Sequence, residues 1–115
     1  MKNNVIENEL INKYIIIRTF CDKRKIADKI INNLLEKKLV AGSQIEKINS
    51  KYWWDNKVEE CYEYKLEFRT KKSLFDKIET EIKKIHDYEV CEISCTEILK
   101  ANDEFLKWID ENTID

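Results

Sequence analysis

The chain has no proline and a single glycine, Gly42, among its 115 residues. Its turns must therefore be formed by Asn, Asp and Ser, the other residues that tolerate turn conformations. One glycine is too few for a glycine-rich phosphate-binding loop. Neither a Ser-His-Asp nor a Cys-His catalytic set is recognisable around the one histidine, His86. We therefore expect that the protein is not an enzyme.

An excess of charge of one sign is also lacking, because 21 Lys and Arg face 23 Asp and Glu. This balance argues against nucleic acid or an anionic membrane as a partner. No segment approaches the ~20 apolar residues of a membrane span, and the polar start of the chain, with Glu7 and Glu9, is unlike a signal peptide. We expect a cytoplasmic protein whose four cysteines, none in a CxxC pair, are reduced.

Apolar periodicity predicts an α+β domain with the order β-α-β-β-α-β and a C-terminal helix. In chain order the predicted elements are a strand at 14–17, a helix at 26–35, an extended stretch at 45–54, a strand at 58–69, a helix at 74–85, a strand at 88–96 and a helix at 103–109. This is the split βαβ, or ferredoxin-like, arrangement, with both crossover helices on one face of the sheet. The predicted domain is 14–115, preceded by a polar N-terminal extension at 1–13.

Polar residues mark the expected ends of these helices. Asp22 is predicted to cap the first helix, Ser73 and Asp76 to form a capping box for the second, and Asn102 to cap the last. Gly42 is predicted to stop the first helix or to form the turn after it.

The segment 58–69 has the clearest pattern in the sequence. Apolar residues from Val58 to Phe68 share one face, and charged residues from Glu59 to Arg69 share the other. A strand of that length, roughly 40 Å, is about twice the usual one. It overreaches a small domain, and with the open sheet face it predicts a self-assembled oligomer. The charged face is either solvated or covered by assembly, in which case Arg18 is a partner for Glu67.

The segment before it predicts the other half of a hairpin. Its apolar parity changes between Ile45 and Ile48, which predicts a bulge or bend. Asp55 and Asn56 supply the turn, since Asn tolerates a positive φ.

Four segments in register carry a resemblance to a known family. They are Leu-Val-Ala-Gly at 39–42, Tyr-Trp-Trp-Asp-Asn-Lys-Val-Glu-Glu at 52–60, His-Asp-Tyr-Glu-Val-Cys-Glu-Ile at 86–93 and Phe-Leu-Lys-Trp at 105–108. The sequence thereby resembles the CutA family of divalent-cation tolerance proteins. The resemblance implies a ferredoxin-like, PII-like homotrimer whose long hairpin reaches across to a neighbouring subunit. It also implies a role in metal tolerance with binding of copper or another divalent cation.

The sequence departs from the family pattern at several positions. Asn56 replaces the turn glycine, and Asp87 and Cys91 replace two prolines. Arg18 and Gly42 stand where many relatives carry cysteines, which are among the soft-metal ligands proposed for the family. Two alternatives to a metal-binding trimer are therefore a structural or assembly trimer without a metal site and a PII-like sensor of a small molecule.

The resemblance and the pattern together nominate site residues. The candidate metal ligands are His86 and Glu89, although a polar cap between helix and strand is the alternative role for His86. The candidate cleft residues are Tyr88, Glu92, Lys57 and Glu59. The candidate interface residues are Tyr52, Trp53, Trp54 and Trp108, with a ligand platform as the alternative for the aromatic cluster.

Cysteines supply no obvious metal site. Four residues along a strand separate Cys91 from Cys95 by roughly 13 Å, too far for one zinc with Zn–S bonds of about 2.3 Å. Sharing a face with Ile93, both are predicted to be small core residues. Cys21 is predicted to be the exposed thiol.

Overall fold

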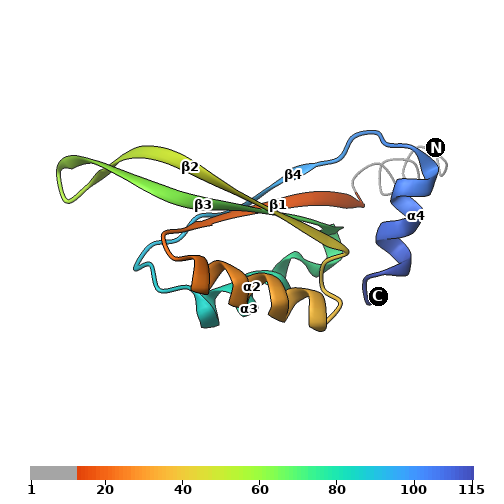
Figure 1. Ribbon diagram of the computed structural model, residues 1–115. Coiled ribbons are helices and arrows are strands. Elements are labelled where there is room, and N and C mark those ends of the chain that lie inside the picture. Colours follow the sequence, from red (N-terminus) through yellow and green to blue (C-terminus); the bar gives the residue numbers. More distant parts are fainter. Residues whose placement is uncertain (1–12) are drawn as a thin grey trace.

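A four-stranded antiparallel sheet forms one layer of the protein and two helices form the other (Figure 1). The computed structural model describes residues 13–115, so the predicted polar N-terminal extension at 1–13 lies outside them except for Lys13. The elements are β1 (Tyr14–Cys21), α2 (Arg24–Glu36), β2 (Gly42–Trp54), β3 (Lys57–Lys71), a 3₁₀ turn η1 (Lys72–Leu74), α3 (Phe75–Ile85), β4 (Ile93–Glu97) and α4 (Asp103–Glu111). The strand order β2-β3-β1-β4 is the predicted ferredoxin-like arrangement.

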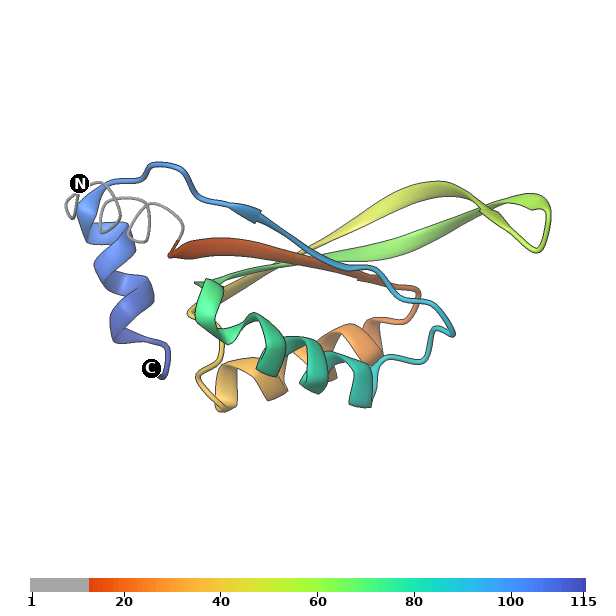
Figure 2. The ribbon, with the colours of Figure 1, turned by 180° about the vertical axis from the view of Figure 1, so that it is seen from behind.

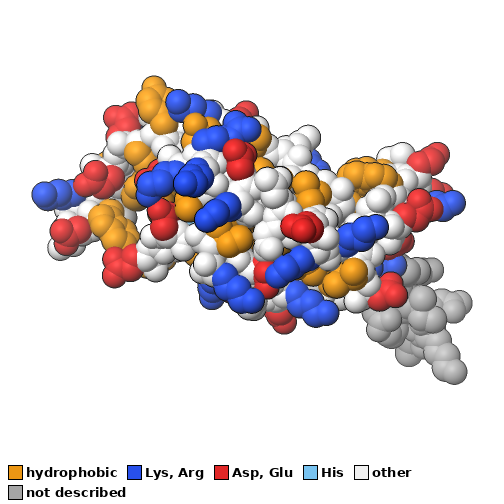
Figure 3. Space-filling view, turned by 60° about the horizontal axis from the view of Figure 1, so that its bottom comes forward, with side chains coloured by type: hydrophobic (Ala, Val, Ile, Leu, Met, Phe, Trp, Pro, Cys, Tyr) orange, Lys and Arg blue, Asp and Glu red, His pale blue; other side chains and the backbone are white. Residues whose placement is uncertain are grey.

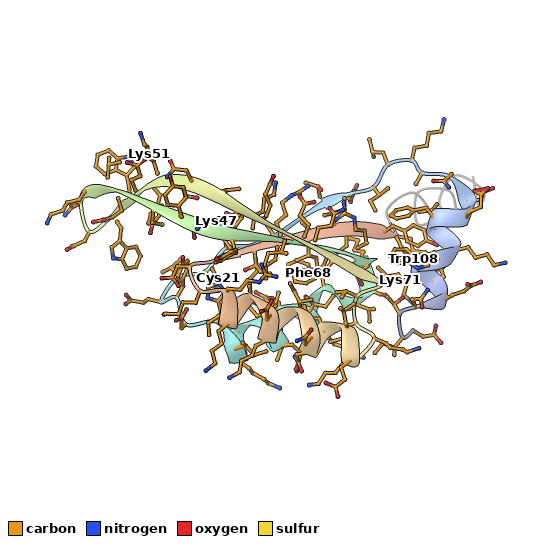
Figure 4. All side chains as sticks on the ribbon, in the orientation of Figure 1. Cys21, Lys47, Lys51, Phe68, Lys71 and Trp108 are labelled. Atoms are coloured by element: carbon orange, nitrogen blue, oxygen red, sulfur yellow. The ribbon has the colours of Figure 1, made fainter. Side chains whose placement is uncertain are left out.

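The core lies between the sheet and the paired helices α2 and α3. Ile15 and Ile17 on the central strand β1 are fully buried there. Phe68 on β3 is buried beside them, between the sheet and the helices (Figure 4). The apolar residues of α2 and α3 recur at helical spacing, so each helix turns one apolar face to the sheet. Ile30 of α2 and Ile78 of α3 are buried on these faces. Burying side chains of this size contributes about 1.5–3 kcal/mol each relative to leaving them exposed, so this face fixes the fold.

The β2–β3 hairpin projects well past the helices, as both ribbon views show (Figures 1 and 2). The strands have 13 and 15 residues, which confirms the predicted overlong strand, and the molecule is 51 Å long but 30 and 23 Å across. Asp55 and Asn56 form the turn with φ of 49° and 61°. Both residues lie in the left-handed region that a tight right-twisted hairpin requires.

The predicted bulge in β2 is wrong. Pairing with β3 runs without interruption from Gly42 opposite Arg69 to Trp54 opposite Lys57. The apolar parity changes because the strand leaves the helix layer. Ile45 packs against the core, whereas Ile48, opposite Glu63, points to the open face of the sheet.

The open face carries the predicted ion pair. Arg18 Nε donates to Glu67 at 2.8 Å, and Arg69 lies 3.4 Å from the same carboxylate. These cations and the hydrogen bond from Arg18 outweigh burial and lower the pKa of Glu67. On the helix side, charges of both signs are interspersed (Figure 3), as the sequence balance predicts.

Three of the predicted helix ends are wrong. The N-caps of α2 and α3 are Lys23 and Leu74 rather than Asp22 and Ser73, and neither makes a side-chain cap bond. Helix α2 ends at Glu36, and the residue with positive φ after it is Lys38, at 55°. Gly42 therefore does not terminate this helix. The N-cap of α4 is Asn102, as predicted, but its amide bonds the Glu104 carboxylate instead of the backbone. Among residues 13–115, no helix is long and apolar enough to cross a bilayer.

The last strand is shorter than predicted, and the cysteine placements change with it. Strand β4 begins at Ile93, the only residue of the strand that packs against the core. Cys95 is exposed and Cys91 half-buried, so neither is a core residue. Cys21 is fully buried, because β1 continues past its apolar run and directs this thiol under the sheet (Figure 4). Burial raises the pKa of Cys21 to about 11, so it is not the exposed thiol.

Candidate functional site

A cleft of about 730 Å³ lies between the projecting hairpin and the irregular segment that joins α3 to β4. Residues 50–54 of the hairpin form one wall and residues 87–92 form the other, with Phe20 and Glu63 between them. The volume is in the range of small-molecule sites. Lys51, labelled in Figure 4, marks the hairpin side of the cleft.

His86 holds the irregular wall in place. Its Nδ1 accepts a hydrogen bond from the backbone N–H of Tyr88 at 3.1 Å, so this nitrogen carries no proton. Its Nε2 therefore carries the proton and donates to the Phe20 carbonyl at 2.6 Å. With both nitrogens engaged, the imidazole has no free lone pair for a metal in this conformation. It ties the end of α3 to the end of β1.

Tyr88 links that wall to the hairpin. Its hydroxyl donates to Glu63 Oε2 at 2.8 Å, across the end of β1. Its ring lies 4.7 Å from the His86 ring, centroid to centroid. Burial, reinforced by the hydrogen bond to the Glu63 carboxylate, raises the pKa of Tyr88, so the hydroxyl stays a proton donor at neutral pH.

Electrostatics in the cleft are dominated by carboxylates. Glu63, Asp87, Glu89 and Glu92 line it against one lysine, Lys51. The hydrogen bond from Lys23, 2.5 Å away, lowers the pKa of Asp87. Most of the other lining residues are aromatic and come mainly from the hairpin, and Ser50, Val90 and Cys91 complete the lining.

The comparisons with known proteins decide the family. A family model described as CutA1 divalent ion tolerance protein matches residues 15–112. The chain belongs to the CutA1 divalent ion tolerance family. The divalent-cation tolerance protein CutA of Pyrococcus horikoshii is 31% identical over 99 residues, which are 86% of this chain and 96% of that protein. The protein of the same description from Archaeoglobus fulgidus is 38% identical over 85 residues, covering 74% of this chain and 83% of that protein.

Solved CutA1 structures have the same fold. CutA1 from Oryza sativa matches with a TM-score of 0.86 at 27% identity, over 90% of this chain and 95% of that one. CutA1 from Pyrococcus horikoshii matches with a TM-score of 0.84 at 29% identity, over 88% and 99% of the two chains. The ferredoxin-like fold predicted from the residues is therefore confirmed.

The structure brings together many of the predicted site residues of this CutA-family chain. The cleft is lined by Tyr88, Glu89, Glu92, Tyr52, Trp53 and Trp54. Lys57 and Glu59 lie nearer the hairpin turn and are not part of its lining. Trp108 lies at the other end of the molecule, on α4 (Figure 4), where its ring stacks on Phe105 at 5.8 Å.

The predicted metal ligands, His86 and Glu89, do not form a chelating pair within this chain. Glu89 lines the cleft, whereas His86 lies behind the wall with both ring nitrogens bonded. Over residues 13–115 there is no group of three His, Cys, Asp or Glu side chains that could hold a metal ion. The donors among residues 13–115 of one chain therefore do not fit a tight copper site, which needs imidazole or thiolate ligands.

Sequence reasoning missed Glu63 and Phe20 as parts of the site. Glu63 was placed with the alternating charges of β3, yet only 7% of it is exposed. The one available signal for Glu63 was its position. The pairing of β1 with β3 ends at Cys21 opposite Tyr64, so the Glu63 carboxylate lies just beyond the end of β1. The group that covers Glu63 is the Tyr88 hydroxyl. No local sequence pattern indicates that these two residues are in contact.

Proposed function

We propose that this CutA-family chain works as a non-enzymatic homotrimer whose cleft, next to a neighbouring subunit, binds a small ligand or a divalent cation. The observation that carries the proposal is the hairpin. It extends beyond the helix layer and leaves Trp53 75%, Tyr62 65% and Val58 59% exposed. Large apolar side chains gathered on one projecting element are typical of an interaction surface.

The edges of the sheet support assembly as well. Strands β2 and β4 lie at the two edges, and β2 offers 13 residues of backbone along its outer side. A long uncovered edge pairs readily with another strand. A second copy of the chain is the partner that needs no further component, and subunits placed around an axis would cover both the hairpins and the open sheet faces.

For metal binding, the carboxylates of the cleft and the hydrogen-bonded imidazole of His86 argue in opposite directions. Names of the relatives refer to divalent cations, and the carboxylates of the cleft suit cations in general. Copper, however, would need His86 to give up a hydrogen bond or a neighbouring subunit to add ligands. The engaged imidazole favours the alternative of an assembly or PII-like small-molecule-binding trimer without a metal site.

Light scattering coupled to size-exclusion chromatography tests the proposal. The reduced protein at micromolar concentration should elute as one species of about three times the 13.9 kDa chain mass. A species with the mass of one chain at all concentrations would contradict it. We place the trimer in the cytoplasm with no nucleic acid or membrane partner, in keeping with the balanced charge.

A further inference from the structure

The lining of the cleft combines two kinds of group that recognise the same chemistry. Aromatic rings come from both walls and from the residues between them: Tyr52, Trp53, Trp54, Tyr88 and Phe20. The faces of such rings attract cations, Trp most strongly. Four carboxylates accompany them, with a single lysine, Lys51, whose amine lies 3.9 Å from Glu60 outside the cleft. A cation is therefore favoured in this cleft and an anion is repelled.

Glu63 indicates which charge the cleft favours in a ligand. This residue is 7% exposed and lines the cleft. Within residues 13–115 it makes no salt bridge, and its one side-chain hydrogen bond is the donation from Tyr88 to Oε2. A carboxylate whose side chain is largely withdrawn from water is normally paired, because the loss of hydration disfavours an isolated charge. Oε1 of Glu63 accepts no hydrogen bond from the described residues, and it is not among their fully buried side-chain atoms without a partner, so this oxygen stays accessible from the cleft.

The size and shape of the cleft distinguish between cations. A bare metal ion would need several ligand atoms within about 2–2.6 Å, and the described residues form no such group. A volume of about 730 Å³ is far larger than an ion needs. Apolar aromatic walls around a few carboxylates instead suit a molecule with a hydrocarbon body and a positively charged end.

We propose that the cleft between residues 50–54 and 87–92 binds a small organic ammonium compound, with its cationic group on Glu63 and its hydrocarbon part against the aromatic residues of the hairpin. This inference rests on the proposed function, because it takes the cleft as the ligand site and names the ligand class. It does not require the metal branch of that proposal.

Calorimetric titration of the full chain with matched probes tests the assignment. Choline is compared with 3,3-dimethylbutan-1-ol, which has its shape without the charge, and putrescine with the uncharged butane-1,4-diol. At least one of the two cations should bind saturably, about tenfold or more tighter than its neutral counterpart. Cation–π contacts with the rings and an ion pair with the Glu63 carboxylate together account for a difference of that size. Equal affinity for the charged and neutral members of both pairs, or no binding of either cation, would overturn the proposal.

Two matched variants locate the site. Glu63→Gln keeps the shape of the side chain and its hydrogen bond from Tyr88 but removes the charge. Glu36→Gln removes the same charge from an exposed position on α2 outside the cleft. Cation affinity should fall at least about tenfold in the first variant and stay unchanged in the second. An unchanged affinity in Glu63→Gln, or an equal fall in both, would refute Glu63 as the counter-charge.

One rival occupant is a basic side chain from a neighbouring subunit. In that case neither cation would bind the wild type, and Glu63→Gln would lower the mass measured by light scattering. These two results together would overturn the inference but would leave the proposed trimer standing. Conversely, a wild-type protein that is monomeric yet binds choline or putrescine through Glu63 would refute the trimer and support the inference, because every cleft residue named here belongs to one chain.

Discussion

The indole of Trp108 lies directly on Gly42. A Cβ atom added at Gly42 would come within 2.8 Å of Cη2 of the indole, closer than such atoms approach in real structures. The contact closes α4 onto the start of β2. It sits beside the hydrogen bond from the Tyr14 hydroxyl to Asp110 Oδ2 at 2.6 Å, which ties the same helix to β1. The single glycine of the chain thus serves close packing and not a turn.

Gly42→Ala should therefore destabilise the protein by about 1–3 kcal/mol, the usual cost of overpacking a close contact. The adjacent Ser43→Ala is the control, because its buried hydroxyl has no hydrogen-bond partner and its loss should be neutral or slightly stabilising. Urea unfolding of both variants measures the difference. Equal stability of Gly42→Ala and wild type would mean that Trp108 is free to move away.

Trp54→Ala should weaken assembly more than it changes the fold of a subunit. Trp54 is 45% exposed on the projecting hairpin, outside the core. Truncating an interface tryptophan costs about 2 kcal/mol or more in association. Leu35→Ala, on an exposed apolar residue of α2, is the control. In sedimentation across a dilution series, Trp54→Ala alone should dissociate at a higher protein concentration than the wild type. Identical behaviour of the two variants would show that the hairpin does not anchor the assembly.

Copper binding by the reduced protein should be weak and should decrease on acidification. His86 must release a hydrogen bond to bind a metal, and an imidazole binds metals only in its neutral form. Calorimetry at pH 7 and pH 5 measures both effects, with His86→Ala expected to abolish what remains. Cys95→Ser is the matched control on the exposed thiol. Tight binding that survives His86→Ala and disappears in Cys95→Ser would contradict this ligand assignment.

Cys21 should make the stability fall in mildly alkaline solution. Burial raises its pKa from 9.0 to about 11. The raised value means that the folded state keeps the thiol proton while the unfolded chain releases it. Its contribution is therefore complete below pH 9 and is lost as the pH rises toward 11. Urea unfolding of wild type and Cys21→Ala between pH 8 and 11 should show a flatter profile for the variant. Parallel profiles would mean that the thiol is accessible to water.

Much of the fold could be predicted because its determinants are local. The alternation over β3 gave the strand, its excessive length and the pairing of Arg18 with Glu67, and helical spacing gave α2 and α3. Cys21 was misplaced because β1 continues for four residues after its uniformly apolar run at 14–17. The contact of Tyr88 with Glu63 joins residues 25 apart across the end of β1. It depends on the path of an irregular segment, which no periodicity encodes.

The central claim is that a neighbouring subunit completes the hairpin, and hydrogen exchange of its backbone amides tests this most directly. A two-stranded ribbon that projects into water is only marginally stable, so its amides would exchange quickly in a monomer. We predict slow exchange for peptides from residues 49–62 in the wild type at micromolar concentration, and fast exchange on dilution or in Trp54→Ala. Fast exchange of this hairpin in the concentrated wild type, with β1 and α2 still protected, would contradict the claim.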